Sequence, residues 1–196
     1  MNGYSANVLS CVLWEKERLM KILVTYYSKT GNTKAVAQAI YDALDLKALA
    51  LEDKEITPVG EVDDTKEYSL IFCGFPVYAH SVPVPVQNFI KTLKPGTNLA
   101  LFSTHGSKTD GQMPKEAIHH AVGLAKDANI LGSFTCRGKV ASEIIDDLMS
   151  KPEHKAWALE AQSAQGHPDQ ADLEDAHVFA RGTLKKAIGF KDFTKK

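Results

Sequence analysis

Hydroxyl and amide side chains are concentrated in one short segment of this chain. The segment consists of Ser28, Lys29, Thr30, Gly31, Asn32 and Thr33. Such side chains donate hydrogen bonds to an anion, and a glycine among them lets the backbone approach a ligand closely. The spacing G-x-x-x-x-G-K-[ST] of nucleotide triphosphatases is absent, as is the G-x-G-x-x-G of dinucleotide folds. The segment therefore indicates a site that holds a terminal phosphate monoester and does not transfer it.

This segment lies between a predicted strand and a predicted helix. Residues 21–27 are an apolar run typical of a strand buried on both faces, and apolar residues recur at helical spacing over 34–44. The free N–H groups and the dipole at the start of such a helix favour an anion. A helix cap by Ser28 or Thr30 would account for one of these side chains, not for four. The pattern predicts a phosphate site at the start of the first helix.

Strands and helices continue to alternate along the chain. Buried strands are predicted at 68–75 and 97–104, and a further strand at 129–136. Helices are predicted at 84–93 and 113–127, and a short, partly exposed strand at 46–51, with 52–66 as a loop containing at most a turn of helix. This order predicts an α/β fold, a doubly wound five-stranded parallel sheet in a three-layer α/β/α sandwich. The loops 28–33, 76–83 and 104–111 all follow strands, so they converge on the carboxyl edge of the sheet, where such folds bind ligands.

The sequence Ser-x-Thr-Gly-Asn-Thr directly after a first strand resembles the FMN-phosphate loop of the flavodoxin family, in which [ST]-x-T-G-x-T occupies this position. The resemblance implies a flavodoxin-like fold with FMN as cofactor. It also implies that the FMN phosphate is held by neighbouring backbone amides and by the side chains of Ser28, Thr30, Asn32 and Thr33. The flavin ring is then expected between two loops, one with Pro76, Val77, Tyr78 and Ala79 and the other with Thr104, His105 and Gly106.

Tyr78 is the best candidate for stacking on the flavin, because it lies on a loop at the binding edge. Electron carriers of the family often place the flavin between a Trp and a Tyr. Neither loop contains a Trp, and Trp14 and Trp157 are expected to lie elsewhere. The second face is then covered in part by His105 or open to a substrate. A solvent-exposed loop histidine is an equally good interpretation of His105.

The last 60 or so residues exceed what the shortest flavodoxins need. Residues 141–149 and 153–165 are predicted to form extra helical segments, and 170–188 the terminal helix. A Gly-His-Pro-Asp motif at 166–169 precedes that helix, where Asp169 is placed as an N-cap and His167 is interpreted as structural. The resemblance is to a flavodoxin subgroup with this motif. We expect one FMN-binding domain over 20–190, with 1–19 as an extension outside it and 191–196 as a frayed tail.

Composition excludes several other classes of protein. The 196 residues carry a net charge of −1, whereas a nucleic-acid-binding domain is expected to be basic. No apolar run approaches the roughly 20 residues that span a bilayer. Three widely separated cysteines fit neither a disulfide framework nor a metal site and favour a reducing, cytoplasmic location. No catalytic or metal-binding set of side chains is predicted.

These observations lead to two functional hypotheses. The first is an FMN-dependent electron-transfer protein that shuttles electrons between redox partner proteins. The alternative is an FMN-dependent NAD(P)H:quinone-type oxidoreductase, with a small molecule as electron acceptor. A cationic rim of Lys29, Lys108, Arg137 and Lys139 is expected near the binding edge, where it would steer an anionic partner or substrate.

Overall fold

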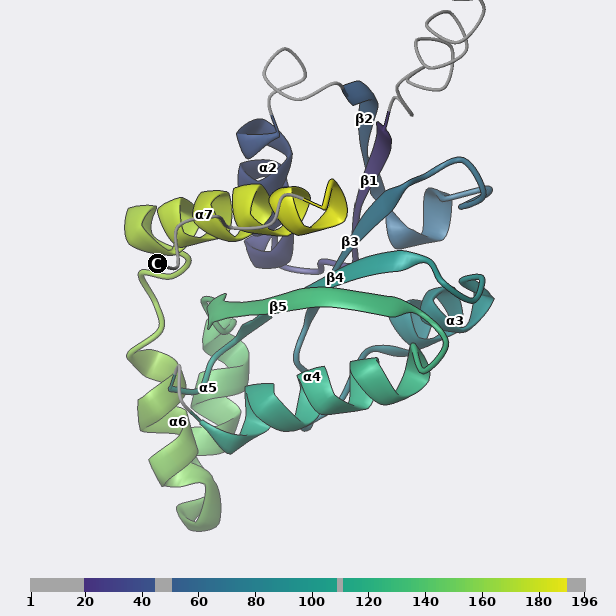
Figure 1. The fold of residues 1–196 in the computed structure, drawn as a ribbon. Coiled ribbons are helices and arrows are strands. Elements are labelled where there is room, and N and C mark those ends of the chain that lie inside the picture. Colours follow the sequence, from purple (N-terminus) through teal and green to yellow (C-terminus); the bar gives the residue numbers. More distant parts are fainter. Residues whose placement is uncertain (1–19, 45–50, 109–110, 190–196) are drawn as a thin grey trace, which may run out of the picture.

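A computed structural model describes residues 20–44, 51–108 and 111–189. Its described residues form one five-stranded sheet in the order β2-β1-β3-β4-β5, with every neighbouring pair parallel (Figure 1). The strands are β1 (Met20–Tyr26), β2 (Leu51–Pro58), β3 (Leu70–Pro76), β4 (Asn98–His105) and β5 (Asn129–Arg137). The predicted fold class is confirmed.

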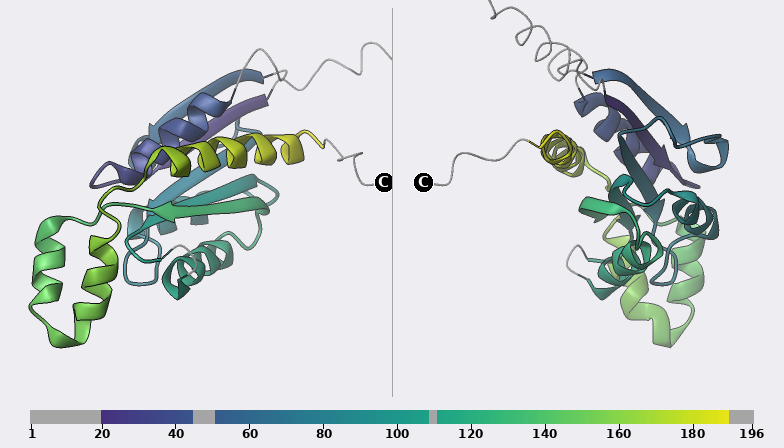
Figure 2. Two further views of the ribbon diagram at one scale, coloured as in Figure 1. Left: turned by 90° about the vertical axis from the view of Figure 1, so that its left-hand side faces the viewer. Right: turned by 45° about the vertical axis from the view of Figure 1, so that its right-hand side comes forward.

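Helices cover both faces of this sheet (Figures 1 and 2). They are α2 (Asn32–Ala43), α3 (Val84–Thr92), α4 (Gln112–Leu124), α5 (Ser142–Met149), α6 (Lys155–Gln162) and α7 (Gln170–Ala187), with short 3-10 turns η1 (Val59–Glu61) and η2 (Pro152–His154). The predicted helices and the strands predicted at 21–27, 68–75, 97–104 and 129–136 are confirmed, with small shifts at their ends, and the last of these strands is only partly buried. None of the helices in the described ranges is long and apolar enough to cross a bilayer.

Two apolar cores form because successive strand residues point to opposite faces. On β1, Ile22 and Val24 pack with α2 and α7, whereas Leu23 packs with α3 and α4 on the other side. All three side chains are fully buried. A strand buried on both faces reads as a continuous apolar run, which is why β1, β3 and β4 were predictable.

The predicted position of the second strand was wrong. It was expected at 46–51 with a loop over 52–66, but β2 runs over Leu51–Pro58 and pairs with β1, for example Val24 with Ile56. Residues 45–50 lie outside the described part of the chain. β2 is an edge strand with exposed charges at Asp53 and Glu55, and edge strands commonly carry such residues. The apolar pattern therefore failed to mark it, although the predicted turn of helix is present as η1.

The chain leaves the sheet after β5 to form the α5–α6 hairpin, residues 142–162, which stands beyond the carboxyl ends of the strands (Figure 2, left). The chain then returns along α7. Asp169 caps α7, because its Oδ1 accepts from the Asp172 N–H at 3.0 Å while Asp172 Oδ2 accepts from the Asp169 N–H at 2.9 Å. His167 Nδ1 lies 2.5 Å from Asp172 Oδ2. The predicted cap is confirmed, and His167 belongs to the same hydrogen-bonded group.

Candidate functional site

The segment 28–33 leads directly into α2 without a side-chain cap. Gly31 is the N-cap residue, with φ 90° in the left-handed region that glycine adopts at little cost. Ser28 Oγ accepts a hydrogen bond from the Gly31 N–H at 3.1 Å, outside the helix. The interpretation of Ser28 or Thr30 as a simple helix cap is therefore wrong. No side chain caps the N-terminus of α2, so the positive end of the helix dipole is available to bind an anion.

The side chains of this segment divide into two groups. Lys29, Thr30 and Asn32 line a cavity at the carboxyl edge of the sheet. Thr33 is instead buried, and its Oγ1 lies 2.8 Å from Thr104 Oγ1. Ser28 likewise has a partner within the loop. Their direct contact with a phosphate stays a prediction.

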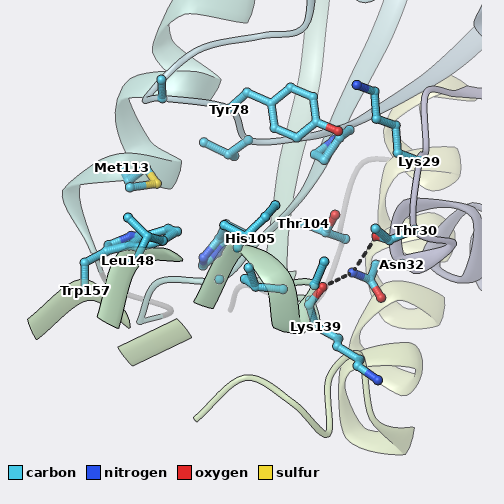
Figure 3. A pocket seen from close by; sticks show the side chains of 18 of the residues that line it. Lys29, Thr30, Asn32, Tyr78, Thr104, His105, Met113, Lys139, Leu148 and Trp157 are labelled. Atoms are coloured by element: carbon cyan, nitrogen blue, oxygen red, sulfur yellow. Dashed lines mark hydrogen bonds between the residues drawn. The ribbon is translucent and has the colours of Figure 1, made fainter. Parts of the chain in front are cut away.

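Asn32 connects the loop to the segment that follows β5. Its side-chain Nδ2 donates to Thr30 Oγ1 at 3.2 Å and to the Lys139 carbonyl at 2.8 Å (Figure 3). An amide nitrogen has two hydrogens, so both are engaged within the protein. Asn32 therefore holds the loop in shape.

The cavity has a volume of about 820 Å³, within the usual range for a small-molecule or cofactor site. Figure 3 shows Thr30 and Asn32 on one side of it and Tyr78 facing across it. Its lining includes all the predicted ring-contact residues, namely Pro76, Val77, Tyr78, Ala79, Thr104, His105 and Gly106. The structure thus brings the three predicted loops to one cavity.

Tyr78 begins a tight turn at the cavity rim. Its N–H donates to the Ser81 carbonyl at 3.1 Å, and the Ser81 N–H donates back at 2.9 Å. The two central residues, Ala79 and His80, have φ of 45° and 63°, a strained conformation for residues with a side chain. Two bonds to α4 hold the turn: His80 Nδ1 to Glu116 Oε2 at 2.7 Å, and Ser81 Oγ to His120 Nδ1 at 2.9 Å.

The Tyr78 side chain remains 40% exposed beside the cavity. Lys29 Nζ lies 5.8 Å from the centre of its ring, within the range of a cation–π contact. Burial of the rest of the side chain raises the pKa of Tyr78, with a smaller effect from Tyr27. The phenol is therefore neutral at physiological pH and presents an aromatic face at the rim.

His105 is buried, with 3% of its surface exposed, so its interpretation as a solvent-exposed loop histidine was wrong. Nδ1 lies 3.0 Å from Ser107 Oγ and 3.1 Å from the Ser107 carbonyl. Nε2 has no hydrogen-bond partner among the described residues. Burial lowers the pKa of this imidazole, the hydrogen bond that the ring donates to the Ser107 carbonyl opposes this effect, and the Arg137 charge adds to it. His105 is thus a neutral ring at the wall of the cavity.

The α5–α6 hairpin forms a wall of the cavity that the sequence did not predict. Ile144, Leu148 and Trp157 line it, together with Met113 of α4. The expectation that Trp157 lies away from the site was therefore wrong. Helical periodicity marks these residues as one face of each helix, but no feature of the sequence indicates where that face docks.

Arg137 anchors this hairpin to the sheet. Its guanidinium donates to the carbonyls of Glu160 at 2.8 Å and of Ser163 and Ser107 at 3.2 Å each. The predicted cationic rim therefore needs correction, since Arg137 is half-buried and its donors face these oxygens. Lys29, Lys108 and Lys139 are exposed.

A profile of the Flavodoxin domain matches residues 23–181 of this chain. The chain belongs to the flavodoxin family. The flavodoxin-like domain-containing protein BilS of Clostridioides difficile (strain CD3) is 32% identical over 180 residues, which cover 86% of this chain and 98% of that protein. Oxidised Flavodoxin 2 from Bacillus cereus has a similar fold, with a TM-score of 0.56 and 18% identity over 85% of this chain and 99% of that one.

A further flavodoxin of similar fold is a short-chain protein associated with a non-canonical PDU bacterial microcompartment. Its TM-score is 0.60, with 17% identity over 86% of this flavodoxin-family chain and 99% of the other. At such identities the structures establish the shared fold alone.

FMN, the cofactor of this flavodoxin-family chain, fits the residues present. The uncapped start of α2 suits its phosphate, and the apolar and aromatic walls suit its ring. The unpartnered Nε2 of His105 is a buried polar group at the same cavity, and such groups normally have a partner. The backbone at Gly138 packs closely on Asn32 in the segment 28–33. A Cβ added to Gly138 would lie only 3.1 Å from Asn32 Nδ2.

Proposed function

We propose that this protein transfers electrons between redox partners, with FMN bound at the carboxyl edge of the sheet. FMN, when bound, accepts and returns the electrons, and the protein supplies binding, orientation and tuning. The observation that carries the proposal is the single cavity that joins the start of α2 to Tyr78 and His105. A phosphate group at one end and a flat ring at the other match this arrangement.

The rim of the cavity supports contact with a partner. Tyr78, Ala79 and His80 are exposed there, so a docked protein would approach the ring without a rearrangement of the core. Lys29 and Lys139 are also exposed at the cavity. Positive side chains at a rim steer an acidic partner towards it and have a smaller effect on affinity.

The chain's own groups would tune the cofactor. Backbone groups of residues 74–79, at the end of β3 and in the following loop, are the candidates, although the N–H groups of Val77 and Tyr78 already donate to the carbonyls of Thr104 and Ser81. The neutral, buried His105 adds no positive charge that would stabilise the reduced, more negative form of a flavin. We expect both groups to affect the reduction potential.

A reductase that acts on a small molecule is the second candidate. The apolar side of the cavity formed by Met113, Ile144 and Leu148 favours it, because an organic substrate would be accepted there. A flavin titration followed by a nicotinamide assay separates the two functions. Rapid reduction and reoxidation by protein partners, without steady-state oxidation of NADH or NADPH by a quinone, supports the carrier. Sustained turnover with the quinone would establish the reductase in its place.

A further inference from the structure

We propose that the α5–α6 hairpin supplies the second wall of the flavin site, with Trp157 as its aromatic contact opposite Tyr78. The proposal rests on FMN binding in this cavity. It assigns a role to helices that lie outside the three loops from which a flavin site was expected. It also accounts for the missing Trp in those loops, because the aromatic side chain comes from a later part of the chain.

The arrangement of the side chains carries this proposal. Figure 3 shows Tyr78 on one side of the cavity and His105, Leu148 and Trp157 on the other. All four residues line the same cavity. Thr30 and Asn32, at the phosphate end, lie at the far side from Trp157. A ligand anchored by its phosphate at the start of α2 would thus extend its ring between Tyr78 and the hairpin.

Contacts with the loop after β4 and with Arg137 hold the α5–α6 hairpin in place beside the cavity. A Cβ built on Gly106 would lie 3.6 Å from the Cβ of Ala161, so α6 packs closely on the loop after β4. Trp157 is one helical turn before Ala161 and shares its face. Arg137 binds the Glu160 carbonyl, and the Lys108 N–H donates to the Glu160 carboxylate. Trp157 is therefore held at the wall of the cavity that His105 and Gly106 also line.

Two buried nitrogens at this wall have no protein partner. Nε1 of Trp157 and Nε2 of His105 are both inaccessible to solvent and find no hydrogen-bond partner among the described residues. Buried polar groups are normally paired, and both residues line the cavity, so a ligand bound there is the candidate partner. An isoalloxazine has carbonyl oxygens and ring nitrogens along its edge, which offer partners of both kinds. The aromatic face of Trp157 would add stacking.

Tryptophan fluorescence provides the direct test. The chain has two tryptophans, Trp14 and Trp157, so the variant Trp14→Phe leaves Trp157 as the only tryptophan reporter. We expect FMN and riboflavin each to quench most of its emission. In Trp157→Ala the Kd of both ligands should rise about tenfold, because the lost contact is to the ring they share.

Three control variants distinguish loss of a contact with the flavin ring from other causes of weaker binding. Leu159→Ala, at an exposed position on the same helix, should leave both affinities unchanged. Thr30→Ala should weaken FMN but not riboflavin, which lacks the phosphate. Trp157→Phe keeps an aromatic ring but lacks Nε1, so it should restore part of the affinity for both ligands, and urea unfolding of Trp157→Ala should verify that the alanine variant is folded.

The proposal is overturned if Trp157 emission is unchanged at FMN saturation and Trp157→Ala binds riboflavin as the wild type does. If Thr30→Ala still weakens FMN in that case, FMN binding stands and the hairpin faces something else. A protein that binds neither flavin contradicts both this proposal and the proposed function.

Discussion

The side-chain amide of Asn32 donates a hydrogen bond to the backbone carbonyl of Lys139, with 2.8 Å between Nδ2 and O. This bond joins the loop before α2 to the segment after β5, which are far apart in the sequence. The Lys139 N–H in turn donates to the His167 carbonyl at 2.8 Å. The end of the cavity where we propose the phosphate binds is therefore shaped by the segment that the Gly-His-Pro-Asp motif holds in place.

Asn32→Ala should weaken FMN binding by about 1–3 kcal/mol, because two internal hydrogen bonds that shape the loop are lost. Isothermal titration with FMN measures the effect. Gln38→Ala, exposed on the same helix and paired with Asp42, is the matched control and should bind normally. Equal affinities for Asn32→Ala and the wild type would show that Asn32 is dispensable for the loop.

Thr30→Ala should weaken FMN binding by a similar amount, about 1–3 kcal/mol, through loss of a hydroxyl that faces the cavity. The affinity for riboflavin should stay unchanged, since the lost donor serves the phosphate. Parallel titrations with the two flavins measure this difference. An equal loss for both would place Thr30 at the ring and not at the phosphate.

Ala79→Gly should raise the free energy of unfolding by about 0.5–1 kcal/mol. Ala79 has φ 45°, and glycine removes the steric cost of that conformation at a smaller entropic cost in the unfolded chain. Urea unfolding measures the change. The control Ala35→Gly, exposed within α2, should lower stability by about the same amount, because there the entropic cost stands alone. Destabilisation by Ala79→Gly would mean that the turn is not strained.

Because of His105, the free energy of unfolding should be lower in mild acid than at neutral pH. Its folded pKa lies below the ordinary value of about 6.5, mainly because of burial, so the unfolded chain binds the proton more readily. Stability is therefore complete above about pH 6.5 and falls as the pH drops from there towards the folded pKa. Urea unfolding at pH 7.5 and 5.5 should show a smaller pH effect in His105→Asn than in the wild type. The same pH effect in both proteins would exclude His105 as the source.

Arg137→Ala should lower the free energy of unfolding by about 1.5–3 kcal/mol, since charged hydrogen bonds to three carbonyls are lost. It should also increase hydrogen exchange within α6, because these bonds attach the helix to the sheet. Arg181→Ala, exposed on α7, is the matched control. Unchanged protection of α6 would show that the hairpin is held by apolar packing alone.

The sequence was sufficient for the parts of the fold that local chemistry determines. Strands such as β3, with Ile71 and Phe72 packed on opposite faces, appear as apolar runs, and Asp169 is recognisable as a cap from its position before α7. The loop at 28–33 was recognisable because its hydroxyls and glycine follow a strand. β2 was misplaced because an edge strand needs few apolar side chains, and its partner β1 determines its position.

The wall of the cavity could not be predicted for a different reason. Trp157 reaches the site because contacts of α6 with Arg137 and Gly106 hold this helix against the ends of β4 and β5. Those contacts join residues with no regular spacing, so no pattern in the sequence signals them. The burial of His105 could not be predicted for the same reason, because it depends on which parts of the chain pack against the loop after β4.

The chain segment between Lys139 and His167 leaves the sheet and then returns, so that its two ends lie next to each other. Beside the bond between these two residues, Gln165 Nε2 donates to the Val140 carbonyl at 3.0 Å, so both ends of the excursion are tied together. Neither of these closing bonds involves a residue of the α5–α6 hairpin itself. We therefore expect a change in the length of the hairpin to leave the segment 28–33, which is bonded to Lys139, in place.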